Sequence, residues 1–190
     1  RPCLTLSQDM LCFEPGEIQR YPWRSRARIR LEALRFLQLR RLANSSVPLF
    51  LTQYARNVIA KLVKLNNAHV IPHGIDERFL TAAAGRHTFP SVEPISCLYV
   101  SNAAPYKHQW NVVEAIALLR ERTGLDLKLR LIGGGAVPAS KRLRQTVAIY
   151  DPEGQFVEIL PFIPNSQIVE ELTVSDIFIF ASSCENLPVT

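Results

Sequence analysis

The second half of the chain alternates apolar runs with amphipathic segments, and this alternation constrains the fold most strongly. Apolar runs predict strands at 95–100, 125–132, 155–163 and 176–182. Helical spacing predicts helices at 108–122, 141–150 and 166–175. Strands that alternate with helices form right-handed βαβ units. We therefore predict an α/β fold whose parallel sheet is covered on both faces. We expect Gly124 to end the first helix, and Asn165 or Ser166 to cap the third.

The first half of the chain shows a weaker form of the same pattern. Residues 25–42 are good helix formers, and we expect Leu31, Leu34 and Leu37 to face the core. A strand is predicted at 47–51, followed by a helix that Thr52 caps and that runs to about residue 65. The apolar run of "AHVIPHGID" predicts another strand, which ends at Pro72 and Gly74.

A change of composition divides the two halves. Residues 81–94, "TAAAGRHTFPSVEP", are small, polar and proline-containing, as is typical of a linker. We therefore predict two domains, residues 1–80 and 95–190, joined by this segment.

Composition and cysteine spacing narrow the class of protein. The chain is 47% apolar and 21% charged, which suits a packed core. Neither a membrane-spanning run nor the pattern of a signal peptide is present. The four cysteines form no C-x-x-C pair and no zinc-ligand spacing, so we expect reduced, buried thiols and no metal site. These features predict a cytoplasmic protein.

The charge points to an anionic partner. The net charge is +5, and eight arginines fall between residues 20 and 41. A phosphorylated small molecule, a lipid surface or a nucleic acid would suit this charge. The arginine-rich helix is either a solvated face or a surface for anionic lipid. Nucleic-acid binding would need exposed aromatic residues among the arginines, whereas we expect the leucines of this helix to face the core.

Three loops that follow predicted strands are candidates for a binding site, because ligands bind beyond the carboxyl ends of parallel strands. Lys107 stands where a helix begins, and its charge is favourable there if an anion lies between it and the free N–H groups. The alternative is a solvated lysine. Gly133 and Gly134 either let the backbone approach a ligand or form a plain turn, and they match no dinucleotide or Walker A pattern. Glu185 either accepts hydrogen bonds from sugar hydroxyls or is an exposed loop residue.

Five motifs in order resemble a known family. They are "VIPHGID", "LYVSNAAPYKHQWNVVEAIALL", "LKLRLIGGG", "EILPFIP" and "DIFIFASSCENLP". Together they resemble retaining glycosyltransferases of the GT-B fold, with family four and its bacterial surface-polysaccharide members nearest. The resemblance implies a partial GT-B fold: residues 1–80 as the end of an N-terminal Rossmann-like, acceptor-side domain, and residues 95–190 as the first half of a Rossmann-like domain for a nucleotide sugar.

The resemblance also implies roles for site residues. Lys107 would bind the donor diphosphate and stabilise the leaving group, and Glu185 would contact the donor sugar. Other donor-binding residues would be Asn102, Gly133, Gly134, Asn186 and Leu187. The reaction would move a hexose to a glycan or lipid-linked acceptor without metal or cofactor. The protein would work in the cytoplasm, in peripheral contact with an anionic membrane at its inner face, and would not bind nucleic acid.

The chain departs from the family pattern at several positions. Ser101 and Asn102 replace a Gly-Arg pair, and residues 185–188 read E-N-L-P in place of E-G-F-G. Gln8 stands where some relatives have histidine, and we assign no role to Gln8 or His73. The second glutamate of the family's E-x7-E motif would lie beyond Thr190. We therefore expect this chain to be a piece of a longer enzyme and to be inactive alone.

Two other classes of function are weighed against this interpretation. The first is another GT-B enzyme, such as a sugar-nucleotide epimerase or a phosphorylase. An epimerase needs more acid/base groups than Glu185, and a phosphorylase usually carries pyridoxal phosphate on a lysine, for which no signature is present. The second is a basic nucleic-acid-binding module, which a salt-sensitive interaction with generic DNA would favour.

Overall fold

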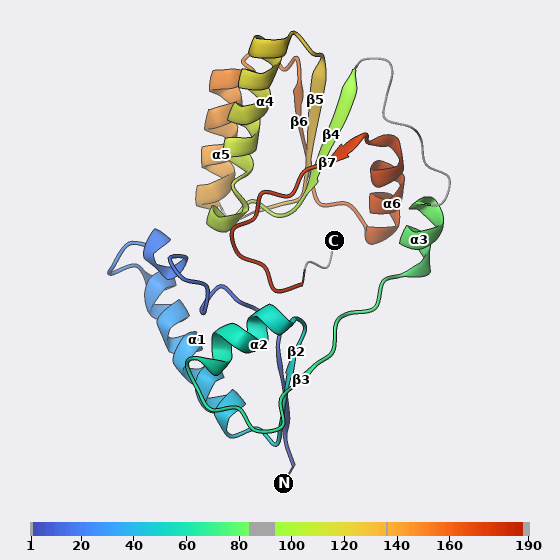
Figure 1. The fold of residues 1–190 in the computed structure, drawn as a ribbon. Coiled ribbons are helices and arrows are strands. Elements are labelled where there is room, and N and C mark those ends of the chain that lie inside the picture. Colours follow the sequence, from blue (N-terminus) through green and yellow to red (C-terminus); the bar gives the residue numbers. More distant parts are fainter. Residues whose placement is uncertain (1, 84–93, 136, 188–190) are drawn as a thin grey trace. The chain divides into compact units, whose positions relative to one another are not determined.

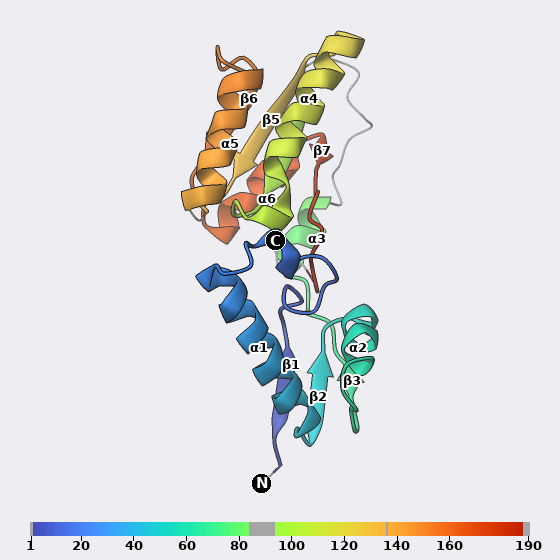
Figure 2. The same ribbon diagram turned by 90° about the vertical axis from the view of Figure 1, so that its left-hand side faces the viewer.

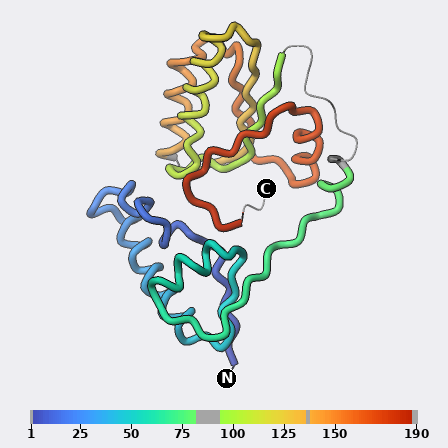
Figure 3. Tube along the Cα trace, viewed as in Figure 1, coloured from blue at the N-terminus to red at the C-terminus, as the bar shows by residue number. Residues whose placement is uncertain are grey.

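The computed structural model describes residues 2–83, 94–135 and 137–187, which form two compact units. The first unit contains the chain up to Gly74 and the segment that starts at Cys184, and the second runs from Ile75 to Ser183. The functional division into residues 1–80 and 95–190 stays a prediction. Most of its linker, residues 84–93, lies outside the described residues. Figure 3 traces the path of the chain.

The first unit is a three-stranded parallel sheet with helices on one side. Its elements are β1 (Leu4–Ser7), the 3-10 turn η1 (Ile18–Arg20), α1 (Arg26–Ala43), β2 (Val47–Phe50), α2 (Gln53–Ala60) and β3 (His69–Val70). The strand order is β1-β2-β3, and α1 and α2 lie on the same side of the strands (Figure 1). Right-handed connections to successive neighbouring strands produce this arrangement. Strand β1 was not predicted from the sequence.

Helix α1 begins and ends close to the predicted bounds, but it buries a different set of leucines. The Ser25 hydroxyl caps it by accepting a hydrogen bond from the backbone N–H of Arg28 at 3.2 Å. Leu31 and Leu42 are buried, whereas Leu37 is 50% exposed, so the prediction that Leu37 faces the core is wrong. Leu31 and Leu42 are eleven residues apart, a spacing that returns to nearly the same side of a helix. Leu37 is six residues from Leu31, a spacing that places it on a different side.

Helix α2 confirms one prediction and shortens another. The Thr52 side chain accepts a hydrogen bond from the N–H of Ala55, as expected of a cap. The helix ends at Ala60, five residues before the predicted end. After Ala60 the hydrogen bonding changes to the tighter 3-10 type, because the N–H of Leu62 bonds the carbonyl of Ile59, three residues before it.

The second unit confirms the α/β prediction with a four-stranded parallel sheet. The strands are β4 (Ile95–Val100), β5 (Leu127–Ile132), β6 (Val157–Leu160) and β7 (Ile177–Phe178), in the order β6-β5-β4-β7. The helices are α3 (Glu77–Ala83), α4 (Gln109–Thr123), α5 (Val137–Tyr150) and α6 (Asn165–Val174), and η2 (Pro105–Lys107) is a 3-10 turn. Helices α4 and α5 cover one face and α6 covers the other (Figure 2).

The core of this unit lies on both faces of the sheet. On one face Tyr99 and Leu129 pack with Val113 of α4 and Leu143 of α5. On the other face β4 and β5 pack with Ile168 of α6. Central strands buried on both faces explain why the sequence shows continuous apolar runs there.

Helix boundaries in the second unit differ from the predictions in two places. Gly124 ends α4 in the left-handed conformation, as predicted. Helix α5 begins four residues early, because Pro138 is tolerated in the first turn of a helix. The residue that caps α6 is Pro164, with no side-chain bond, so neither Asn165 nor Ser166 is the cap.

The cysteines are free thiols in different environments. Cys12, Cys97 and Cys184 are buried, whereas Cys3 is exposed, contrary to the expectation of four buried thiols. Burial raises the pKa of the Cys12 thiol to about 11 and that of Cys184 to about 12, with smaller contributions from nearby carboxylates. These two thiols are therefore protonated and unreactive at neutral pH. Among the described residues, no helix is both long and apolar enough to cross a bilayer.

Candidate functional site

The loops that follow β4, β5 and β7 meet at the carboxyl edge of the second unit's sheet. The N–H of Ala103 bonds the carbonyl of Gly134 at 2.7 Å, which joins the first two loops. The N–H of Ser183 bonds the carbonyl of Tyr106 at 2.9 Å, which joins the first loop to the third. His108 Nε2 lies 2.9 Å from the Ser183 hydroxyl. The structure therefore fixes these loops against one another at the edge where ligands bind in such sheets.

The glycines after β5 allow a very close approach of two backbones. Gly133 has a φ of 139°, and a Cβ atom there would lie 2.4 Å from the carbonyl oxygen of Ser101. A Cβ atom on Gly135 would lie 2.6 Å from that of Ala103. A Cβ atom on Gly134 would meet nothing within 4 Å. Only Gly133 and Gly135 are therefore required for packing, and Gly134 lines open space.

Lys107 lies in the turn that connects β4 to α4. It is 8% exposed, and its Nζ lies 5.3 Å from the ring centroids of both Tyr106 and Phe180. The buried hydroxyl of Tyr99 donates a hydrogen bond to the Lys107 carbonyl at 2.5 Å. His108 follows with a φ of 51° and begins α4 without a side-chain cap. The sequence placed a cation near this helix start, and the structure shows that the cation is buried between aromatic rings.

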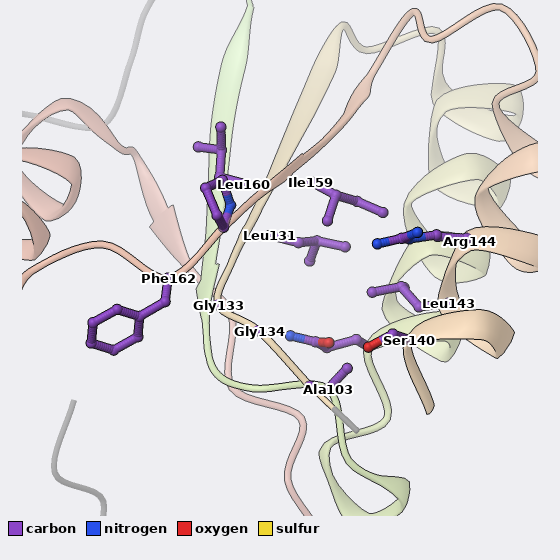
Figure 4. Close-up of a pocket in the computed structure, with 13 residues that line it drawn as sticks. Ala103, Leu131, Gly133, Gly134, Ser140, Leu143, Arg144, Ile159, Leu160 and Phe162 are labelled. Carbon is purple, nitrogen blue, oxygen red and sulfur yellow. The ribbon is translucent and has the colours of Figure 1, made fainter. Parts of the chain in front are cut away.

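A cavity of about 410 Å³ opens beside these loops (Figure 4). Its apolar wall consists of Leu131 of β5, Leu143 of α5 and Ile159 of β6. The polar groups of Ser140 and Arg144 line it from α5, and Arg144 extends toward the strands. The remaining lining residues are Ala103, Gln109, Gly133, Gly134, Gly135, Leu160, Pro161 and Phe162. A cavity of this size with few polar groups suits one small organic molecule.

Sequence reasoning missed the part of this site that α5 and β6 contribute. Ser140 and Arg144 are one helical turn apart and therefore share a face of α5. Two polar residues at this spacing, shortly after a glycine turn, were the sequence feature that could have predicted their place in the site. No described residue forms an ion pair with Arg144. Phe162, which follows β6, is 79% exposed at the cavity.

The predicted site residues belong to both units. Asn102, Lys107, Gly133 and Gly134 lie in the second unit, where Gly133 and Gly134 line the cavity and Asn102 is exposed. Glu185, Asn186 and Leu187 belong to the first unit.

The amide of Asn186 is occupied within the first unit. Its Nδ2 donates to the carbonyl of Ser7 at 2.9 Å, and its Oδ1 accepts from the hydroxyl of Thr52 at 2.9 Å. In the first unit Asn186 therefore ties the end of β1 to the start of α2. The roles of all seven predicted residues in binding and catalysis stay predictions. Within the described ranges no group of three or more His, Cys, Asp or Glu residues is arranged to hold a metal ion.

Solved structures similar to this chain are GT-B glycosyltransferases. A TarM variant from S. aureus, bound to UDP and glycan compounds, has a TM-score of 0.69 and 12% identity over 99% of this chain and 34% of its own. Sucrose-phosphate synthase from Thermosynechococcus elongatus has a TM-score of 0.70 and 18% identity over 98% and 46%. HepE from Anabaena, bound to UDP and glucose, has a TM-score of 0.64 and 17% identity over 96% and 46%. The chain thus spans about a third to a half of these structures, and at such identities the likeness shows the fold.

The sequence comparisons give one match. No curated protein sequence matches the chain significantly. The family model described as glycosyl transferases group 1 matches residues 86–190, which is more than half of the chain. The partial GT-B fold predicted from the sequence is confirmed, and the chain belongs to the group 1 glycosyl transferases.

Proposed function

We propose that this chain is part of a retaining glycosyltransferase of family four. The enzyme would move a hexose from a nucleotide diphosphate sugar to a glycan or lipid-linked acceptor, as bacterial surface-polysaccharide enzymes do. Membership of the group 1 family and the GT-B fold support a sugar transfer of this kind. UDP occurs with both the TarM variant and HepE, so UDP-sugars are the first donors to test.

The observation that carries this proposal is the cavity beside the Lys107 loop. A nucleoside would pack its base on the apolar wall of Leu131, Leu143 and Ile159, with Arg144 near its polar edge. The open space at Gly134 would admit a ligand close to the backbone. The diphosphate would then lie toward the loop between Ala103 and Gln109, both of which line the cavity and flank Lys107 in the sequence.

Lys107 would supply the charge that the reaction needs. When the sugar leaves the nucleotide, negative charge grows on the diphosphate, and a fixed ammonium group stabilises it. The aromatic rings of Tyr106 and Phe180 hold that ammonium group in place. We propose that this charge replaces a metal ion and that Glu185 contacts the donor sugar. The cytoplasmic location expected from the sequence is part of this proposal.

Binding of UDP and GDP to the 190-residue chain tests the proposal. An NMR titration suits the weak affinity expected of a partial donor site. Lys107→Met keeps the length of the side chain and removes its charge, and Lys64→Met is the matched control on an exposed lysine of the first unit. Loss of one charge-assisted contact to phosphate corresponds to about 1.5–3 kcal/mol, or roughly 10- to 150-fold in Kd.

The expected result is binding that EDTA leaves unchanged, that Lys107→Met weakens by this factor and that Lys64→Met leaves unchanged. Binding that Lys107→Met does not weaken would assign the diphosphate to other groups. The absence of any nucleotide binding, by a chain that NMR shows to be folded, would contradict a donor site in the second unit. A UDP-sugar panel on the same samples then identifies the sugar.

A further inference from the structure

Gln109 is a buried residue at the start of α4 that borders the cavity. It is 3% exposed, and it is one of the residues that line the space of about 410 Å³ beside the Lys107 loop. Its Nε2 donates a hydrogen bond to the carbonyl of Ser101, just after β4, at 2.9 Å. The nitrogen of the amide therefore holds the start of the loop between β4 and α4.

The side-chain oxygen of Gln109 has no partner within the described residues. The atom is buried, and no described residue donates a hydrogen bond to it. Exchange of the amide oxygen and nitrogen would not supply one, because it would place the oxygen against the Ser101 carbonyl, which only accepts. A buried polar atom without a hydrogen bond costs free energy, so this oxygen points to a partner from outside the described residues.

The chemistry of the Gln109 oxygen restricts what its partner can be. A carbonyl oxygen accepts hydrogen bonds and donates none, so it repels the oxygens of a diphosphate. The apolar wall of Leu131, Leu143 and Ile159 lines the same cavity and offers no donor. The group of a ligand that meets Gln109 must therefore carry an O–H or an N–H.

We propose that Gln109 Oε1 accepts a hydrogen bond from a ribose hydroxyl of the nucleotide sugar. The inference rests on the donor site proposed above, in which the base packs on the apolar wall and the diphosphate lies toward the loop between Ala103 and Gln109. The ribose joins these two parts of a nucleotide, and its hydroxyls are its only donors. The N–H groups of the base lie at its polar edge, which is near Arg144 in that site. Gln109 thus selects ribonucleotides over deoxyribonucleotides.

Titrations of the 190-residue chain with UDP, 2′-deoxy-UDP and 3′-deoxy-UDP, followed by NMR, test the proposal. Each analogue lacks one ribose hydroxyl and keeps the base and the diphosphate. Gln109→Met keeps nearly the same size and removes the amide, and Gln167→Met is the matched control on an exposed glutamine of the second unit. Parent and variant, each with UDP and with an analogue, form a double-mutant cycle that isolates the contact.

We expect the parent to bind one of the two analogues about 2- to 12-fold more weakly than UDP, which is the range for loss of one hydrogen bond between neutral groups. Gln109→Met should bind UDP and that analogue equally, because the acceptor is absent. Gln167→Met should keep the preference of the parent. In the parent, the side-chain N–H signals of Gln109 should shift with UDP and much less with that analogue, which reports the contact without any substitution.

Three results would overturn the inference and leave the donor site standing. The first is equal binding of UDP and both analogues by the parent. The second is a Gln109→Met chain that binds more weakly but keeps the preference for the hydroxyl, because Gln109 would then only hold the loop through Ser101. The third is a Gln109 side-chain signal that UDP and both analogues shift equally. The absence of UDP binding by a folded parent would contradict the donor site itself, and this inference with it.

Discussion

Substitution of alanine for Gly133 and, separately, for Gly134 tests the backbone approach that forms the cavity wall. Gly133→Ala places a Cβ atom 2.4 Å from the carbonyl oxygen of Ser101, on a residue whose φ is 139°. Strain at such a φ costs about 1–3 kcal/mol, and forced overpacking adds about 1–3 kcal/mol. We therefore expect Gly133→Ala to lower the free energy of unfolding of the second unit by about 2–6 kcal/mol. At Gly134 the added methyl group meets nothing within 4 Å, so the effect should be within about 0.5 kcal/mol.

The assay must report the second unit alone, because two units need not unfold together. The chain has two tryptophans, Trp23 in the first unit and Trp110 in the second. Trp23 is 76% exposed, so Trp23→Phe should remove its signal with little effect on stability. In that background, urea unfolding followed by Trp110 fluorescence gives the midpoint of the second unit for each glycine variant.

The two glycine variants must separate if the structure is right about this turn. Equal urea midpoints for Gly133→Ala and Gly134→Ala would refute the close approach of Gly133 to Ser101. A large loss in Gly134→Ala would contradict the open space at that residue. Nucleotide binding by Gly134→Ala then measures how closely a ligand approaches Gly134, because the fold is unchanged.

Two further predictions concern the packing of α1 and the stability of the second unit in acid. Leu42→Ala should destabilise the first unit by about 2–5 kcal/mol and Leu37→Ala by less than about 1 kcal/mol, because of these two leucines only Leu42 is buried. Hydrogen exchange of the backbone amides of α1 measures both effects in the first unit alone. Equal effects of the two substitutions would contradict an α1 that turns Leu42 toward the core and Leu37 toward solvent. Burial of Asp151 raises its pKa, but backbone hydrogen bonds from the N–H groups of residues 155–157 outweigh this, and its pKa is lowered from 3.8. Its contribution is therefore present above pH 3.8 and is lost as the pH falls through the lower folded value. Asp151→Asn should destabilise the second unit at neutral pH by about 2–4 kcal/mol, because a neutral amide forms weaker hydrogen bonds with these N–H groups. The difference in the free energy of unfolding between variant and parent should shrink in acid. A difference that does not change with pH would refute the role of the carboxylate.

The sequence predicted the second unit better than the first, for a physical reason. Strands β4 and β5 are buried on both faces and appear as continuous apolar runs, which differ clearly from the helices between them. Strand β1 has only four residues and includes a threonine and a serine, so its apolar signal is short. The orientation of α1 was predicted wrongly because arginines and leucines are interspersed along the whole helix. No single face is continuously apolar, so the sequence pattern does not show which leucines are buried.

The candidate site could be predicted only where a loop directly follows a strand. Lys107 and Gly133 were predicted as site residues because they lie in the loops that follow β4 and β5. Arg144 was missed because its position at the cavity depends on the rotation of α5, and Pro138 hid the start of that helix. The burial of Lys107 could not be foreseen either, because Phe180 reaches it from a distant part of the chain.

The hydrogen bond from Tyr99 to the Lys107 carbonyl has a thermodynamic consequence for any ligand that binds there. Together with the Ser183 to Tyr106 bond, it holds the loop on two sides without a ligand. Association then loses little conformational entropy, because the loop is not ordered by binding. Tyr99→Phe would leave every charge at the site unchanged, and calorimetry would show its cost as a less favourable entropy of binding. Tyr99, a fully buried residue of the sheet, would thus influence affinity without touching the ligand.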